Sequence, residues 1–161
     1  MISRCCAVAA AGSLEESWPI ESFENYIYHV RVYGPNGFFR ELSVNAGDLD
    51  VAIACEYERP GNMLKKLTGN IDLKITKMDA AKSFTVEIRD NAYKNKSTTK
   101  VLAVNTADNG NGHTIILNLN KSFGWYDFSA LIKCHDSFER RYAGHVETGK
   151  ESFTDPVIGR V

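Results

Sequence analysis

The chain has 161 residues, a hydrophobic fraction of 43% and a formal net charge of −1, from 19 basic and 20 acidic residues. This length suits a single domain that buries a sufficient core without disulfides or metals. The balanced charge argues against nucleic acid or an anionic membrane surface as the partner, and no segment reaches the roughly 20 apolar residues of a membrane span.

The first 20 residues differ in composition from the rest of the chain. Arg4, followed by small apolar residues from Cys5 to Gly12, looks like a signal peptide. A secretory core normally holds roughly 7–15 strongly apolar residues, and this stretch is only weakly hydrophobic. We therefore interpret residues 1–20 as a disordered leader or a remnant of a domain boundary, with a signal peptide as the alternative. Residues 21–161 are expected to form one domain.

The globular part of the chain begins with a predicted β-hairpin. Apolar and polar residues alternate from Tyr26 to Val32, as they do in a half-buried strand. Gly34-Pro35-Asn36-Gly37 then predicts a turn, because Pro presets φ and Asn and Gly tolerate positive φ. A second strand from Phe38 to Val44 completes the hairpin.

The same alternation continues along the chain and predicts seven more strands. They are expected at Val51 to Tyr57, Ile71 to Ile75, Phe84 to Ile88, Val101 to Val104, Ile115 to Leu119, Tyr126 to Cys134 and Phe138 to Val146. Asn109-Gly110-Asn111-Gly112 is the strongest hairpin turn signal, and no segment shows a sustained 3.6-residue apolar repeat. The prediction is an all-β fold, an antiparallel β-sandwich of about eight to nine short strands with an Ig-like or C2-like architecture. A small barrel is the alternative.

The four cysteines offer no metal-binding or redox motif. Cys5 and Cys6 are adjacent near the N-terminus, and Cys55 and Cys134 fall in predicted strands, but no Cys-x-x-Cys pair exists. We interpret Cys55 and Cys134 as small buried hydrophobic residues. A disulfide between them is the alternative, and it requires their strands to face each other.

Several stretches of the chain are long and distinctive enough to carry a family resemblance. They are Tyr28 to Arg40 (YHVRVYGPNGFFR), Gly124 to Phe128 (GWYDF), Phe138 to Gly149 (FERRYAGHVETG) with Ser152 and Asp155-Pro156 after it, and Asp90 to Tyr93 (DNAY). In this order they resemble the C-terminal domain of bacterial phospholipases C of the phosphocholine-preferring, acid-phosphatase-like family. The resemblance spans about Tyr26 to Pro156.

The resemblance implies a role without chemistry of its own. In that family a large N-terminal domain carries the phosphodiesterase activity, and the β-rich module, often in tandem copies, follows it. This chain is similar to the module alone, so the resemblance implies no catalytic residue, no cofactor and a phospholipase catalytic domain as partner, in the same or a neighbouring chain. It also implies a secreted or periplasmic location, because those enzymes are exported. The chain is either a fragment of such an enzyme or a free-standing protein.

Four residues are candidates for binding a ligand: Trp125, Asp127, Arg40 and Asn36. If Tyr126 and Phe128 point inward, Trp125 and Asp127 point outward and offer a ring and a carboxylate to a cationic phospholipid headgroup or a glycan. In the first predicted turn, backbone amides beside Asn36 could hold an anion and Arg40 could pair with a phosphate. The structural alternatives are a tryptophan that covers the edge of the sandwich and a turn whose glycines serve only positive φ.

The remaining titratable residues form no recognisable catalytic motif. The sequence contains no His-x-His, His-x-x-x-His or Gly-x-Ser-x-Gly, which argues against a metal site or a nucleophile. The aspartates lie mostly in predicted turns, where a calcium site is the alternative to their ordinary turn-forming role; they are Asp48, Asp50, Asp90, Asp108, Asp127, Asp136 and Asp155. The hypothesis is a non-catalytic accessory domain of a phospholipase C-type enzyme. The alternatives are a free-standing carbohydrate- or protein-binding sandwich and an enzyme in its own right.

Overall fold

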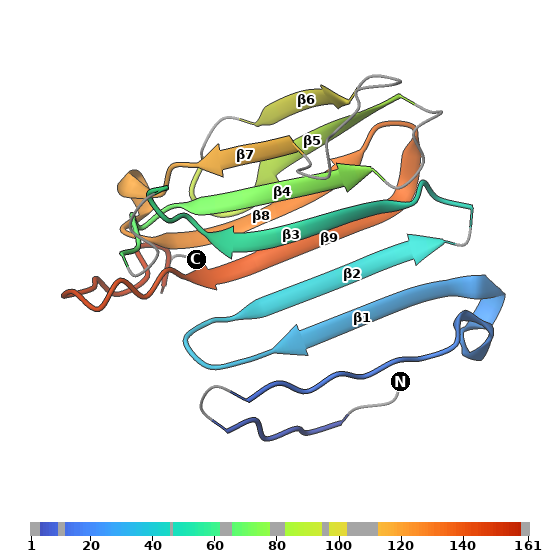
Figure 1. The fold of residues 1–161 in the computed structure, drawn as a ribbon, viewed down its shortest axis with the longest axis horizontal. Helices are drawn as coiled ribbons and strands as arrows, with labels where there is room; N and C mark the ends of the chain where they lie inside the picture. Colours follow the sequence, from blue (N-terminus) through green and yellow to red (C-terminus); the bar gives the residue numbers. More distant parts are fainter. Residues whose placement is uncertain are drawn as a thin grey trace.

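The computed structural model describes residues 4–9, 12–45, 47–61, 66–77, 83–94, 97–102 and 113–158. This part of the chain contains nine strands and three short 3-10 helices (Figure 1). The strands are β1 (Ile27–Tyr33), β2 (Phe39–Asn45), β3 (Val51–Tyr57), β4 (Ile71–Lys77), β5 (Phe84–Asp90), β6 (Thr98–Leu102), β7 (His113–Leu117), β8 (Trp125–Ile132) and β9 (His135–His145). The 3-10 helices are η1 (Ile20–Ser22), η2 (Glu24–Tyr26) and η3 (Asn120–Ser122).

The strands form two antiparallel sheets that pack face to face. The larger sheet has the order β1-β2-β9-β8-β5-β6, and the smaller sheet has the order β3-β4-β7. Neither sheet closes on itself, so the predicted all-β sandwich is confirmed and the alternative of a small barrel is wrong. The smaller sheet lies over β9, β8 and β5, whereas β1 and β2 extend beyond it (Figure 1). We call the face of the larger sheet that is turned toward the smaller sheet its inner face.

The core lies between the two sheets and follows from the alternation in the sequence. Side chains at every second position of β8, among them Tyr126 and Phe128, are buried against β4, whose Ile71, Leu73 and Ile75 are inaccessible to solvent. Burying each such side chain contributes roughly 1.5–3 kcal/mol. The predicted orientation of β8 is therefore confirmed: Tyr126 and Phe128 point inward, and the intervening residues point outward.

Most predicted strands agree with the structure, and the main difference is the turn between β8 and β9. The sequence predicted a strand that ran to Cys134 and a turn at His135-Asp136. In the structure β8 pairs with β9 as far as Ile132 opposite His135, which leaves only Lys133 and Cys134 for the turn. Cys134 takes a φ of 67°, and the ladder shifts register between Leu131 and Ile132. This bulge shortens the connection, a feature that alternation alone does not reveal.

Two further predictions concern β6 and the cysteines. Strand β6 begins at Thr98, three residues before the predicted start, because its polar residues pair with β5 although they carry no apolar signal. Ala103, Val104 and the predicted turn at residues 109–112 lie outside the described residues.

Cys55 and Cys134 are free thiols, so the alternative of a disulfide between them is wrong in this structure. The interpretation of Cys134 as a buried residue is also wrong, because it lies exposed in the β8–β9 turn, whereas Cys55 is partly buried.

The N-terminal segment runs along one edge of the larger sheet. Residues 4–9 and 12–19 lie beyond β1 in Figure 1 and are not assigned to a strand. An ion pair of 3.0 Å joins Arg4 to Glu16 across this segment. The interpretation of residues 1–20 as a leader or boundary remnant stays a prediction.

Candidate binding site at the hairpin end

The stretches that carry the family resemblance meet at one end of the sandwich. The β1–β2 turn packs against the start of β8, since a Cβ added at Gly37 would lie 3.2 Å from Cζ3 of Trp125. Trp125 is opposite His145 at the end of β9 in the ladder. The C-terminal segment lies against the same place, because Phe153 contacts both Trp125 and Phe123. We call this region the hairpin end.

The β1–β2 turn owes its shape to Asn36 and Gly37. These residues have φ values of 53° and 71°, the left-handed pair that a type I′ turn requires and that Asn-Gly adopts readily. Hydrogen bonds from the Gly34 amide to the Phe38 carbonyl and from the Phe38 amide to the Pro35 carbonyl close the turn. Asn36 therefore stands at its tip, where its amide nitrogen lies 3.4 Å from Oε1 of Glu147.

Trp125 is half-buried on the outer face, and its ring is fixed on both sides. The indole Nε1–H donates a 2.8 Å hydrogen bond to the carbonyl of Phe153. The ring lies against the imidazole of His145, with centroids 4.7 Å apart. His145 is itself held by the Phe123 carbonyl at 3.1 Å and by the Glu147 carboxylate at 3.2 Å. The tryptophan is thus a rigid surface element whose partners are all within the domain.

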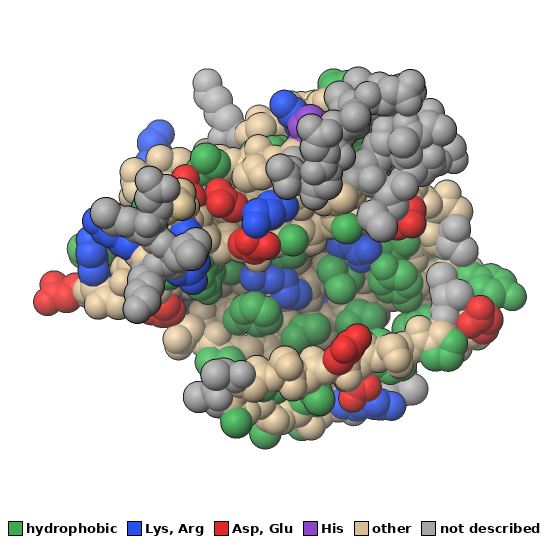
Figure 2. Space-filling view, viewed as in Figure 1, with side chains coloured by type: hydrophobic (Ala, Val, Ile, Leu, Met, Phe, Trp, Pro, Cys, Tyr) green, Lys and Arg blue, Asp and Glu red, His purple; other side chains and the backbone are tan. Residues whose placement is uncertain are grey.

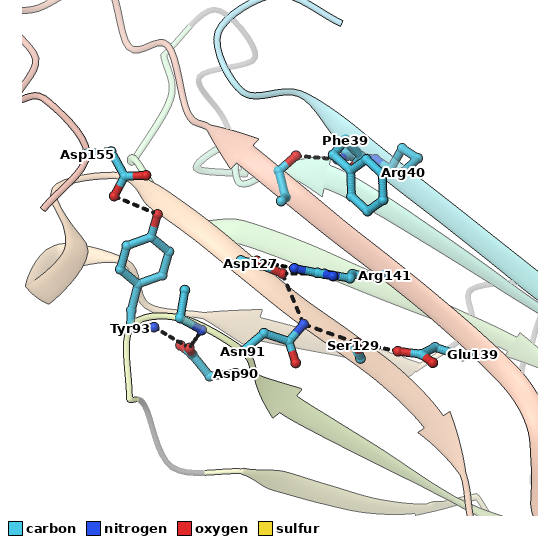
Figure 3. Close-up of polar contacts among 12 residues, drawn as sticks. Phe39, Arg40, Asp90, Asn91, Tyr93, Asp127, Ser129, Glu139, Arg141 and Asp155 are labelled. Atoms are coloured by element: carbon cyan, nitrogen blue, oxygen red, sulfur yellow. Dashed lines mark hydrogen bonds and ion pairs between the residues drawn. The ribbon is translucent and has the colours of Figure 1, made fainter. Parts of the chain in front are cut away.

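Asp127 lies two residues along β8 on the same outer face, but its carboxylate is engaged. Its two oxygens accept hydrogen bonds from Nε and Nη2 of Arg141, at 2.9 and 2.7 Å. The amide of Asn91 donates a further bond of 3.0 Å (Figure 3). The side chain of Asp127 is only 17% exposed. The hydrogen bond to Asp127 raises the pKa of Arg141, so this guanidinium stays charged.

Arg40 points to the inner face, away from Trp125 and Asp127. Its Nη1 donates to the carbonyls of Phe39 and Ala143, at 2.8 and 2.9 Å (Figure 3). Its Nη2 donates to the hydroxyl of Tyr126 at 3.1 Å, and its guanidinium lies 4.2 Å from the ring centroid of Phe38. The structure therefore brings Asn36, Trp125 and Asp127 to one region and places Arg40 behind them as a link between β2 and β9.

A pocket of about 220 Å³ opens at the hairpin end beside these residues. It is lined by Pro35, Asn36, Phe38, Tyr57, Tyr126, Gly144, His145 and Glu147. Burial raises the pKa of Tyr57, and it raises the pKa of Tyr126 to about 12, so both phenols are neutral at physiological pH. Aromatic walls with one half-exposed carboxylate, that of Glu147, suit a small polar or cationic group.

Apart from Asn36, no residue that lines this pocket is among the candidates for ligand binding that the sequence suggested. Glu147 lies within one of the stretches that carry the family resemblance, and this was the only feature of the sequence that could have pointed to it. Tyr57 comes from β3 in the other sheet, where its Oη donates a 3.2 Å bond to the carbonyl of His145. Nothing in the sequence marks that contact across the two sheets.

The DNAY stretch and the C-terminal Asp155-Pro156 are also joined. Asp90 caps its own turn by accepting hydrogen bonds from the amides of Ala92 and Tyr93. The hydroxyl of Tyr93 then donates to Asp155 at 3.1 Å (Figure 3). These contacts fix the C-terminal segment to the outer face, which gives the aspartates a structural role in their turns.

The described residues carry neither a metal-type cluster nor a membrane-spanning helix. They contain no group of three or more His, Cys, Asp and Glu side chains arranged to hold a metal ion. They also contain no helix with the length and hydropathy needed to cross a membrane. Asp108, one of the predicted turn aspartates, lies outside the described residues.

The fold and this site define a two-layered β-sandwich whose distinctive stretches gather at one end. A family model described as "Bacterial phospholipase C, C-terminal domain" matches residues 3–43. The chain is 31% identical over 136 residues to the non-hemolytic phospholipase C of Pseudomonas aeruginosa, covering 82% of the chain and 18% of that relative. It is 34% identical over 155 residues to the non-hemolytic phospholipase C of Burkholderia pseudomallei, covering 94% of the chain and 20% of that relative.

A hemolytic phospholipase C of Pseudomonas aeruginosa is 32% identical over 134 residues, which cover 81% of the chain and 17% of the relative. The chain therefore spans about a fifth of the length of the curated relatives that it matches. It matches the C-terminal domain of bacterial phospholipase C, and the resemblance found in the sequence is confirmed.

Proposed function

We propose that this chain is a non-catalytic accessory domain of a bacterial phospholipase C-type enzyme. It works beside a catalytic domain in the same or a neighbouring chain, in the periplasm or outside the cell. The observation that carries this proposal is the pattern of the matches: they take in most of this chain but only about a fifth of each phospholipase C. A domain that accounts for so little of those proteins, and that matches a C-terminal family model, is suited to assist hydrolysis elsewhere.

Within this role, the hairpin end engages a phospholipid headgroup or a glycan. Trp125 and Asn36 contact the ligand, because they lie at the surface and their positions are fixed by neighbouring contacts. Asp127 and Arg40 have a structural role, because their charged groups are held by Arg141 and by backbone carbonyls. The pocket supplies Glu147, whose side chain is 55% exposed, as the counter-charge for a cationic group.

A second candidate is a free-standing carbohydrate- or protein-binding sandwich. The fixed ring of Trp125 favours it, since a rigid aromatic surface also stacks on sugar rings at low entropic cost. Binding to glycans in the absence of any binding to lipid would support this candidate over the first.

Co-sedimentation with phosphatidylcholine vesicles, with and without calcium, tests the headgroup role. The purified chain is expected to sediment with the vesicles, and Trp125→Ala is expected to bind at least fivefold more weakly. Trp18→Ala is the matched control, because Trp18 is the other tryptophan and lies, 45% exposed, in the N-terminal segment. Thermal unfolding of each variant shows whether it is folded.

Two outcomes would contradict the proposal. Equal binding by both tryptophan variants, or no binding by the parent chain, would remove the headgroup role. Hydrolysis of a phosphocholine ester by the isolated chain would show that the domain is an enzyme in its own right. A Trp125→Ala variant that unfolds is replaced by Glu147→Gln, which changes the exposed carboxylate of the pocket and keeps the hydrogen-bonding shape.

A further inference from the structure

The inner face of β1 and β2 is apolar beyond the reach of the smaller sheet. Val30 of β1 is opposite Leu42 of β2, which is opposite Arg140 of β9, and directly paired residues point to the same face. The described core includes no residue of β1, and from β2 it includes only Val44 at its margin. We call the surface formed by Tyr28, Val30, Val32, Leu42 and Arg140 the open shelf. Figure 2 shows hydrophobic side chains with Lys or Arg side chains among them over β1 and β2.

The inner face of β1 is apolar although the described core does not extend to it. Its outer face carries His29 and Arg31, both within 2.6 Å of the Glu41 carboxylate. Its inner face carries Val30 and Val32 instead, and Val32 is 47% exposed. An uncovered apolar edge strand promotes unwanted association, so natural proteins usually cover it.

One hydrogen-bond donor of Arg140, at the edge of this apolar surface, is unpaired within the described part of the chain. Its Nη2 donates to the hydroxyl of Tyr28 at 3.0 Å, and its guanidinium lies over the rings of Phe138 and Tyr28, 5.1 and 5.7 Å from their centroids. Its Nη1 is buried and has no hydrogen-bond partner among the residues that the structure describes. Because Nη1 is inaccessible to solvent in the isolated chain, it offers no donor to an approaching partner.

We infer that the open shelf is the surface on which the catalytic domain of the phospholipase C-type enzyme docks. The surface of the catalytic domain that docks is apolar where it meets Val30, Val32 and Leu42. This inference rests on the proposed function, and two observations support this occupant. About four-fifths of each relative lies outside the part that this chain matches, and the N-terminal segment runs beside β1, at the edge of the shelf (Figure 1).

The test compares the isolated chain with a full-length enzyme that contains it. In the Burkholderia pseudomallei relative, this chain replaces the matched part, and hydroxyl-radical footprinting measures side-chain accessibility in both proteins. Labelling of Tyr28, Val32 and Leu42 is expected to fall at least threefold in the chimera. Val101 is the internal control: it is 62% exposed and lies on the outer face of β6, at the opposite edge of the same sheet.

Variants then show whether protection comes from docking. Val32→Lys in the chimera is expected to restore labelling of Leu42 to the level of the isolated chain, whereas Val101→Lys leaves it protected. Equal labelling of the shelf in the chimera and the isolated chain overturns the inference. Protection that grows with the concentration of the isolated chain also overturns it, because the occupant is then a second copy. The vesicle experiment probes the hairpin end of the isolated chain, so its failure is distinguishable from failure of the docking surface.

Discussion

Asp127 of β8 and Arg141 of β9 are joined across the larger sheet by two parallel hydrogen bonds, of 2.9 and 2.7 Å. The pair lies within a polar network on the outer face, in which Asn91 donates to Asp127 and to Ser129 and Ser129 donates to Glu139 (Figure 3). The carboxylate that the sequence suggested as a ligand for a cation therefore already neutralises a cation of its own. A substitution of Asp127 can therefore show whether this residue stabilises the fold or contacts a ligand.

Asp127→Ala is expected to lower the free energy of unfolding by about 1–3 kcal/mol, because it leaves the partly buried guanidinium of Arg141 without its carboxylate partner, whereas Asn91 keeps Ser129 as an acceptor. The affinity for vesicles is expected to change less than twofold. Urea unfolding and vesicle co-sedimentation measure the two effects. Glu87→Gln is the control, since the ion pair between Glu87 and Arg89 is longer, at 3.5 Å, and the arginine is mostly exposed. Loss of vesicle binding with unchanged stability would show that Asp127 contacts the ligand directly.

A second prediction concerns the close approach of Gly144 to Tyr126. Gly144 has a φ of 155°, and a Cβ at this position would lie 2.8 Å from the hydroxyl of Tyr126 and 3.1 Å from its Cζ. Gly144→Ala is therefore expected to lower the free energy of unfolding by about 1–3 kcal/mol. In a double-mutant cycle, Tyr126→Phe is expected to relieve part of this loss, because it removes the nearer atom. Additive effects of the two substitutions would show that the hydroxyl is not the source of the clash.

The strands were predictable because each sheet has one face in the core. The alternation of Val51, Ile53 and Cys55 with small or polar residues marked β3 with its correct ends, and the Asn36-Gly37 pair marked the β1–β2 turn. Prediction from the sequence failed where backbone pairing between strands, and not the alternation of apolar side chains, decides where a strand begins or ends. Strand β6 begins with polar residues because β5 offers a free edge, and the β8–β9 turn moved because a bulge changed the register.

The candidate site was only partly predictable for a related reason. The outward direction of Trp125 follows from the period of two in β8, so the sequence revealed it. The same rule, applied to β2, does not show which of its faces meets the second sheet, and Arg40 lies on the inner one. Contacts between sheets, such as Tyr57 with the carbonyl of His145, depend on how the layers are stacked. No local pattern in the sequence encodes that stacking.

The pH dependence of stability is expected to show the contribution of Glu41. Burial favours the neutral carboxyl, but hydrogen bonds from Arg31 and His29 outweigh it and hold the pKa of Glu41 below the ordinary value of 4.5. A carboxyl whose pKa is lower in the folded state stabilises the fold above its unfolded pKa. This stability is lost as the pH falls from about 4.5 through the lower folded pKa. Thermal unfolding of the parent chain and Glu41→Gln between pH 3 and 7 measures it. The difference between the two proteins is expected to shrink toward pH 3, and a constant difference would contradict the assignment.

The four thiols provide the last prediction, because the structure separates them by exposure. Cys5, Cys6 and Cys134 are exposed, whereas burial raises the pKa of Cys55 to about 11. The thiolate is the reactive form, so Cys55 is expected to be inert at pH 8 while the domain is folded. Titration with a thiol-specific disulfide reagent is expected to detect three fast equivalents in the native protein.

A fourth equivalent is expected after unfolding in the absence of a reducing agent. Cys55→Ala should remove only the slow equivalent, and Cys134→Ser only a fast one. If unfolding exposes no further thiol and Cys134 is silent in the native protein, the two residues form a disulfide in solution. The β8–β9 turn must then differ from the structure, in which the positive φ of Cys134 places that residue outside both strands.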